Sequence, residues 1–482
     1  MIVLYIFLGL VGILVLLLLA ALVNTIIIKD RTPNIEPIKI DSQQADKFAK
    51  ELSKMIKVET LSYTNAEANI EKFDELQLVM KKLFPNVYST LEQEVFKGGS
   101  ILFKWVGKSD KKPMVLMAHQ DVVPANKNDW TFEPFSGEVT DTDIYGRGTL
   151  DTKGTLYAFF KAIDDLIKSG FVPEHDIYIS SSTDEEISGY GAGLSVERLQ
   201  KLGVTPYIVL DEGGAIVTGS LPSVTKPMAL IGVIEKGYCN IKFTAKSKGG
   251  HSSTPPKNTP IARLSAFVND VENHFPMKTK MIKEVQDIFE AAAPAMSGPF
   301  RYLFGNMWLF KPLITFLLPK INNFGRALLS TTIAFTMSKG SDAENVIPSE
   351  AYVIANLRTH PIQDIDASFK VLEAIAKKYD IEAEITEGRE TSPISNVNND
   401  AYKYLIKQIV KTFPDVLVSP YVMLGGTDSR FFSEITESAF RFSPTRMDNK
   451  ELSKIHGKDE AIKKSALYEA VIFYKEFIKN HK

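Results

Sequence analysis

Three apolar stretches that each end in acidic side chains constrain the fold of this 482-residue chain more than any other feature. MVLMAH leads to Asp121, DIYISSST leads to 184–186, and YIVL leads to Asp211 and Glu212. Each stretch is typical of a buried strand, and helical patterns such as TLYAFFKAIDDLIKSG lie between them. Alternating strands and helices predict an α/β layer with a mainly parallel sheet, in which the carboxyl ends of adjacent strands meet at one edge.

Length and composition indicate a globular protein of several domains. A chain of 482 residues exceeds what one ordinary hydrophobic core supports, so two or three domains are expected. Apolar residues make up 44% of the chain and charged residues 24%, which is typical of folded proteins. The net charge of -2 gives no reason to expect a nucleic-acid partner. Cys239 is the single cysteine, which excludes an internal disulfide framework and a cysteine-based zinc site.

The N-terminal stretch from Ile2 to Ile28 contains no charged residue. It is long enough to cross a hydrocarbon core of about 30 Å as a helix. A cleaved signal peptide usually has a basic start, and none is present here, so we expect a single uncleaved membrane anchor over 2–28. The positive-inside rule applied to Lys29 and Arg31 argues for a cytoplasmic location of the following chain. Residues 29–40, with Pro33 and Pro37, are predicted to form a linker.

The order of the elements predicts one domain inserted into another. Residues 41–237 and 391–482 alternate between helix and strand and form the predicted catalytic domain. Residues 238–390 read as strand, helix, strand, strand, helix and strand, which is the ferredoxin-like arrangement and predicts a lid or dimerisation domain. An apolar insertion over 276–330, containing MWLFKPLITFLLPKI, interrupts this inserted domain.

The acids at the strand ends predict a metal site. A lone histidine such as His119 is more often structural, DTKG after Asp151 is an ordinary helix start, and an acidic run is usually a solvated turn. Taken together these features favour a cation, because burying several unpaired carboxylates costs several kcal/mol each. Histidine and carboxylate ligands without cysteine suit Zn²⁺, with Mn²⁺ or Co²⁺ as alternatives.

Seven motifs carry a family resemblance, and they occur in the order MAHQDVVP, YGRGTLDTKG, SSTDEEISG, VLDEGG, GGHSSTPP, NVIPSEA and GGTDSR. The chain resembles, over roughly residues 45–480, the dinuclear zinc peptidases that include carboxypeptidase S, aminoacylase and glutamate carboxypeptidase. Its greatest likeness is to carboxypeptidase S and the secreted N-acyl amino acid synthase/hydrolase. The resemblance implies two zinc ions per chain. Asp151 would bridge them, with His119 and Asp211 on one ion and Glu186 and His456 on the other.

The resemblance also implies the catalytic and substrate-binding residues. Glu185 matches the general base, and Asp121 matches the carboxylate that orients the histidine ligand two residues before it. His251 matches a residue that stabilises the oxyanion and that comes from the neighbouring subunit in dimeric relatives. Arg358 and Asn345 match the residues that hold the carboxylate of the substrate.

The leading functional hypothesis is a zinc-dependent hydrolase of amide bonds next to a free amino-acid carboxylate. Carboxypeptidase action on short peptides competes with hydrolysis of N-acyl amino acids. The apolar insertion favours a hydrophobic acyl group or side chain, although a structural role or membrane contact explains it equally well. A membrane-tethered binding protein on a hydrolase fold is the alternative outside the enzymes. The resemblance implies a homodimer through the inserted domain and a catalytic domain on the non-cytoplasmic side.

Overall fold

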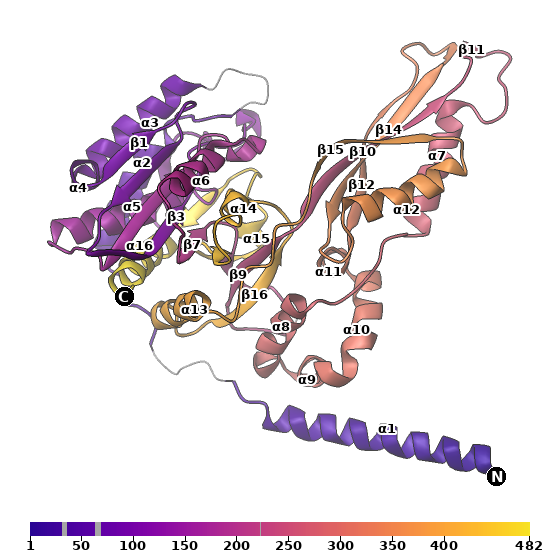
Figure 1. The fold of residues 1–482 in the computed structure, drawn as a ribbon, viewed down its shortest axis with the longest axis horizontal. Helices are drawn as coiled ribbons and strands as arrows, with labels where there is room; N and C mark the ends of the chain where they lie inside the picture. Colours follow the sequence, from indigo (N-terminus) through magenta and orange to yellow (C-terminus); the bar gives the residue numbers. More distant parts are fainter. Residues whose placement is uncertain (31–35, 63–68, 222) are drawn as a thin grey trace.

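The computed structural model describes residues 1–30, 36–62, 69–221 and 223–482. Arg31 and Pro33 of the predicted linker lie outside the described residues. Figure 1 shows a larger lobe on the left, a narrower lobe on the right and helix α1 (Ile2–Ile27) extending from the middle to the lower right, below the narrower lobe. The larger lobe is built from the two stretches of chain that flank the narrower one.

A ten-stranded mixed sheet forms the centre of the larger lobe, with the order β1-β2-β6-β3-β7-β17-β9-β8-β18 and with β16 beside β9. Its strands are β1 (Glu92–Val95), β2 (Ile101–Trp105), β3 (Ser109–Met117), β6 (His175–Ser181), β7 (Ile208–Asp211), β8 (Ala215–Thr218), β9 (Met228–Glu235), β16 (Leu417–Met423), β17 (Ala439–Arg441) and β18 (Arg446–Asp448). A second, three-stranded sheet joins β19 (Ala461–Lys463), β5 (Asp143–Tyr145) and β4 (Glu138–Val139).

The prediction of a mainly parallel sheet was wrong in its outer part. The central strands β6, β3, β7 and β17 are parallel to one another. In contrast, β1 pairs antiparallel with β2, β2 with β6, and β9 with both β8 and β17. Antiparallel neighbours need only short connections, and the pattern of apolar residues does not distinguish them from strands joined by a helical crossover.

Helices cover both faces of the large sheet. The lobe contains α2 (Ser42–Ile56), α3 (Ile70–Leu83), α4 (Pro85–Thr90), α5 (Lys153–Lys168), α6 (Gly191–Lys201), α13 (Asp400–Thr412), α14 (Ser429–Phe432), α15 (Asn449–Leu452) and α16 (Lys464–Lys479). Helices α2, α5, α13 and α16 bury their apolar faces in one core cluster, whereas α6 and Phe432 of α14 belong to another. Asp41 caps the N-terminus of α2, since it accepts hydrogen bonds from the backbone N–H groups of Gln43 and Gln44 at 3.0 and 3.1 Å.

The narrower lobe contains the predicted order of six elements. These are β10 (Gly237–Lys246), α7 (Pro260–Asn273), β12 (Thr332–Lys339), β14 (Glu350–Thr359), α12 (Ile365–Lys377) and β15 (Glu382–Arg389). They form an antiparallel sheet in the order β12-β14-β10-β15, with α7 and α12 packed against it in a separate core. The short strands β11 (Gly250–His251) and β13 (Val346–Ile347) pair at the far tip of this lobe (Figure 1).

The apolar insertion forms helices between the two lobes. They are α8 (Lys283–Ala292), α9 (Gly298–Phe304), α10 (Met307–Ile321) and α11 (Asn323–Leu329). Val285, Ile288 and Phe289 of α8 belong to the same core cluster as Leu417 and Val422 of β16, so the insertion packs onto the larger lobe. Helix α1, with a mean hydropathy of 3.2, is long and apolar enough to cross a membrane, a property that it shares with signal sequences.

Candidate active site

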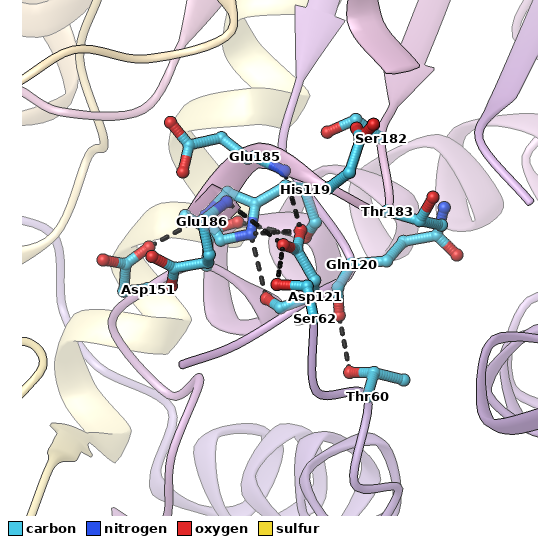
Figure 2. Close-up of polar contacts among 12 residues, drawn as sticks. Thr60, Ser62, His119, Gln120, Asp121, Asp151, Ser182, Thr183, Glu185 and Glu186 are labelled. Atoms are coloured by element: carbon cyan, nitrogen blue, oxygen red, sulfur yellow. Dashed lines mark hydrogen bonds and ion pairs between the residues drawn. The ribbon is translucent and has the colours of Figure 1, made fainter. Parts of the chain in front are cut away.

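The candidate site lies where the central parallel strands end. His119 and Asp121 follow β3, and Glu185 and Glu186 form the single turn that follows β6. Asp151 precedes α5, in the loop that the sequence YGRGTLDTKG forms. The carboxyl ends of neighbouring parallel strands therefore deliver these side chains to one place, as the sequence predicts. Figure 2 shows His119, Asp151, Glu185 and Glu186 converging there.

One group of ligand-type atoms forms around His119. Its Nε2 atom lies 2.9 Å from Oδ1 of Asp151 and 3.3 Å from Oε1 of Glu212. The His119 side chain is almost completely buried. These three residues can each direct one ligand atom at a single ion.

A second group forms around His456. Its Nε2 atom lies 3.1 Å from Oδ2 of Asp151 and 3.0 Å from Oε2 of Glu186. Asp151 therefore offers one carboxylate oxygen to each group. Two sites that share one carboxylate are the arrangement expected of a dinuclear centre.

The structure places Glu212, not the predicted Asp211, beside His119. Asp211 is buried, and its two oxygens accept hydrogen bonds from the backbone N–H groups of Glu212 at 2.9 Å and Ser429 at 2.7 Å. Asp211 is the last residue of β7 and Glu212 follows it, and successive side chains along a strand point in opposite directions. The adjacent acids Asp211 and Glu212 in the sequence indicated a metal ligand at this strand end, but they did not show which of the two residues it is.

Asp121 connects the histidine to the acidic turn. Its backbone carbonyl and its Oδ1 atom lie 2.9 and 3.2 Å from Nδ1 of His119. Its carboxylate also accepts hydrogen bonds from the backbone N–H groups of Glu185 at 3.3 Å and Glu186 at 3.1 Å, and from Ser62 Oγ at 2.7 Å. Figure 2 shows Asp121 at the centre of these bonds. One carboxylate thus fixes both His119 and the turn that carries the predicted base.

Crowding of acids dominates the electrostatics of the site. Burial raises the pKa of the Glu185 and Glu212 carboxyls well above their ordinary values, and it also raises the pKa of Glu186. Burial acts in the same direction on Asp151, but hydrogen bonds from His119 and His456 outweigh it and lower the pKa of that carboxyl. Hydrogen bonds to Asp151 and Glu186 raise the pKa of His456 to about 10. The cluster therefore favours positive charge, either protons or metal ions.

The residues fit a metal centre. Oε1 of Glu186 is a buried oxygen without a hydrogen-bond partner among the described residues, and leaving such a group unpaired costs free energy. The donor set of two histidines and three carboxylates contains no sulfur, which suits Zn²⁺, Mn²⁺ or Co²⁺. Divalent ions would pair the free oxygen and neutralise the adjacent acids.

A cleft of about 660 Å³ joins the acidic turn to the narrower lobe. Glu186 and Arg358 of β14 both line this cleft. Arg389 and Arg430 also line this cleft, although the sequence analysis gave neither a role. Burial and then the charge of Arg430 lower the pKa of Arg389, whose guanidinium also senses the charge of Glu185. A Cβ atom on Gly426 would collide with Arg389, so this arginine packs directly on the GGTDSR segment.

His251 and Asn345 lie together, but at the tip of the narrower lobe. His251 is exposed, its Nδ1 atom lies 2.8 Å from Ser253 Oγ, and the carbonyl of Asn345 accepts a hydrogen bond from Ser252 N–H at 3.0 Å. Figure 1 shows β11, which carries His251, at the end of this lobe that is remote from β3 and β7. Within one chain, the fold does not bring these two residues to the strand-end cluster.

Glu460 is a positioning residue that the sequence analysis missed. Its Oε1 atom accepts hydrogen bonds from the backbone N–H groups of Gly148 at 3.1 Å, Leu150 at 2.8 Å and Asp151 at 3.2 Å. Its Oε2 atom accepts one from Arg147 at 2.6 Å. Glu460 is completely buried and follows His456 by four positions, so it ties the Asp151 loop to the His456 segment.

Comparison with known proteins shows which family this chain resembles in sequence. The family described as "Peptidase family M20/M25/M40" matches residues 115–480. The N-fatty-acyl-amino acid synthase/hydrolase PM20D1 of Xenopus tropicalis is 35% identical over 92% of this chain and 87% of its own. Probable carboxypeptidase S-like 2 of Dictyostelium discoideum is 34% identical over 98% of this chain and 92% of its own.

Solved structures share the fold. The M20 family metallo-carboxypeptidase Sso-CP2 of Sulfolobus solfataricus has a TM-score of 0.67 and 20% sequence identity, covering 90% of this chain and 99% of its own. The YXEP protein of Bacillus subtilis, described as a dinuclear metal-binding peptidase of the M20 family, has a TM-score of 0.55 with 14% identity over 90% of this chain and 98% of its own. The predicted family and the predicted hydrolase class are confirmed: this chain belongs to peptidase family M20/M25/M40.

Proposed function

We propose that this chain is a two-zinc hydrolase that cleaves the amide bond beside the free carboxylate of an amino acid, acting on short peptides as a carboxypeptidase. The observation that carries the proposal is the pair of ligand groups that share Asp151, next to a cleft lined by three arginines. His119, Asp151 and Glu212 would hold one ion, and Asp151, Glu186 and His456 the other. Mn²⁺ and Co²⁺ are the alternative metals.

The chain's own residues supply proton transfer and orientation. When bound, the two ions would polarise the scissile carbonyl and lower the pKa of a water molecule. Glu185 accepts a proton from the attacking water and delivers it to the leaving amine nitrogen, so that the amine departs neutral. Asp121 contacts both the Glu185 turn and His119, and so holds them in fixed positions relative to each other.

Arg358 and Arg389 bind the carboxylate of the substrate in the cleft. A planar guanidinium pairs with a carboxylate through two parallel hydrogen bonds, and partial burial strengthens the pair. The ring of Tyr238, 4.9 Å from the Arg358 guanidinium, helps to hold that side chain in place. A substrate that ends in a neutral amide would leave these half-buried cations without a carboxylate partner.

Hydrolysis of N-acyl amino acids is the second candidate. The names of relatives favour it, since the 35% identical frog protein is an N-fatty-acyl-amino acid synthase/hydrolase. Such a substrate has the same free carboxylate beside the same type of amide bond, so the proposed machinery would serve both reactions. The two candidates differ in the acyl side of the scissile bond.

His251 would reach the oxyanion of the reaction in a homodimer. Its exposure at the tip of the narrower lobe, beside Asn345, supports a contribution to the site of a second copy rather than its own. We also propose that α1 is a single-pass anchor that holds the catalytic domain on the non-cytoplasmic side of a membrane.

Metal analysis and substrate profiling test the function. Dialysed full-length protein should retain about two zinc ions per chain, as a two-metal hydrolase requires. Mass spectrometry of dipeptides and N-acyl amino acids, each as the acid and as the amide, should show cleavage of the acids. Arg358→Ala and Arg389→Ala should each reduce the preference for acids, whereas Arg198→Ala, a surface control paired with Glu94, should not. Full activity without metal, or equal cleavage of acids and amides, would refute the proposal.

A further inference from the structure

Helix α10 presents an apolar face that no other part of the described structure covers. Trp308, Phe316 and Ile321 are 55%, 61% and 77% exposed, and Leu313 and Leu317 are exposed beside them. Leu313, Phe316, Leu317 and Ile321, separated by three, one and four positions, lie on one side of the helix, and Trp308 lies near its start. A contiguous apolar face on the surface of a protein marks a contact with a partner or with lipid.

The charged residues of the segment that contains α10 are all basic. Residues 291–331 contain no aspartate or glutamate, and their basic residues are Arg301, Lys311, Lys320 and Arg326. The Nζ atom of Lys320 lies over the ring of Phe316 at 3.5 Å from its centre, so a basic group flanks the apolar face itself. Basic groups beside exposed aromatic and aliphatic side chains are typical of helices that lie in the interface of an anionic bilayer.

The insertion is also fastened to the C-terminal part of α1. Asn24 Nδ2 donates hydrogen bonds to the carbonyl of Gly305 at 3.0 Å and to Asn306 Oδ1 at 2.9 Å. Asn306 Nδ2 donates in return to the carbonyl of Ala21 at 3.0 Å and to Thr25 Oγ1 at 2.9 Å, and Asn306 is fully buried. Figure 1 shows α1 passing below α9 and α10. Polar groups that satisfy one another between apolar helices are suited to a low-dielectric environment.

We propose that α1 and the exposed face of α10 form one membrane-docking surface, in which α10 lies in the headgroup and upper acyl region of an anionic bilayer. The hydrogen bonds to Asn306 fix the start of α10 beside the C-terminal part of α1. Because α8 packs into the core of the larger lobe, the contact sets the orientation of the catalytic domain rather than only tethering it. The inference is independent of the substrate, but it requires α1 to enter the membrane.

Spin labelling of the full-length chain tests the proposal. Cys239 is buried, so single new cysteines can be labelled selectively. The test positions are Phe316→Cys and Ile321→Cys, Val11→Cys reports on α1, and Leu202→Cys is a control at an exposed apolar residue of the catalytic lobe. The protein is placed in vesicles of phosphatidylcholine with or without phosphatidylglycerol, and the collision rates of each label with oxygen and with a water-soluble nickel chelate are measured.

The expected result is an oxygen-to-nickel ratio at 316 and 321 that exceeds the ratio at 202 several-fold and approaches the ratio at 11. The ratio at 321 should fall when phosphatidylglycerol is omitted, or in the Lys311→Gln/Lys320→Gln variant. If the label at position 11 has a high oxygen-to-nickel ratio but the labels at 316 and 321 have the same ratio as the label at 202, the docking of α10 is overturned and the anchor is supported. If the label at position 11 also has the same ratio as the label at 202, the membrane anchor and the docking of α10 are both overturned. Protection of 316 and 321 from both reagents would show that a second copy covers the face, and equal ratios in both types of vesicle would refute the role of anionic lipid.

Discussion

The strand-end cluster around Asp151 and the tip of the narrower lobe around His251 differ in how completely the chain itself fixes them. Asp121 and Glu460 hold the cluster through hydrogen bonds to side chains and to backbone N–H groups, and both residues are completely buried. His251 is exposed and is held by bonds to its near neighbour Ser253. The chain itself therefore holds the cluster in place, whereas the role proposed for the tip requires contact with another copy of the chain.

The largest expected effect separates two adjacent residues of the cluster. Glu185→Gln removes the proposed base but no ligand, so turnover should fall by about 10²–10⁴-fold while the metal content stays unchanged. Glu186→Gln, the matched control, should lose metal as well, because the Oε2 atom of Glu186 faces His456. Atomic absorption of both dialysed variants, together with kcat, makes the comparison. Equal metal loss in the two variants would contradict the separate roles.

The next prediction concerns Glu212, which lies in the ligand position that the sequence analysis gave to Asp211. Glu212→Gln should lose about one metal ion per chain and lower activity by roughly 10²-fold or more, because a carboxylate ligand of the first ion is gone. Asp211→Asn should keep both ions but destabilise the fold by about 1–3 kcal/mol, since one buried backbone N–H loses its acceptor. Metal analysis and thermal unfolding of the Glu212→Gln and Asp211→Asn variants distinguish these two effects. Metal loss in Asp211→Asn alone would restore the original assignment.

These two residues also show where prediction from sequence ends. Apolar runs and their polar ends identified β3, β6 and β7 and the residues that follow them, because burial and strand periodicity are local properties. Which member of an adjacent acidic pair faces the site depends on the exact end of a strand. Strand pairing is also non-local, so the antiparallel outer strands of the sheet were missed.

Glu460 and Arg389 were missed for a related reason. Each is an ordinary charged residue in the sequence, and its role arises from contacts with distant parts of the chain, such as the bond from Asp151 N–H to Glu460. His251 was identified through a family motif, but a motif does not state which copy of the chain receives the residue.

A smaller effect is expected at the tip, and it tests directly whether the two regions meet between subunits. His251→Ala should lower kcat by about 10²–10³-fold, the usual cost of losing an oxyanion donor, without loss of metal or stability. A mixture of equal amounts of His251→Ala and Glu185→Gln chains, unfolded together and refolded, should regain roughly a quarter of the wild-type activity if a twofold dimer exchanges His251. No recovery, despite mixed dimers in native mass spectrometry, would place His251 in the site of its own chain.

The smallest expected effect concerns Glu460, because its variant changes no ligand. In Glu460→Gln, the amide can still accept bonds from the Asp151 loop, but its NH₂ group then faces the N–H donors of Arg147. Residues that orient a ligand typically change metal affinity by about 10–100-fold, so chelator competition should show weaker binding of both ions, which share Asp151. At saturating zinc, kcat should recover to within a few-fold of the wild type. Glu94→Gln, at a surface carboxylate paired with Arg198, should change neither value. If Glu460→Gln lowers the melting temperature but leaves metal affinity unchanged, Glu460 stabilises the fold rather than the metal site. The strand-end cluster around Asp151 would then depend less on the residues that surround it than the hydrogen bonds of Glu460 indicate.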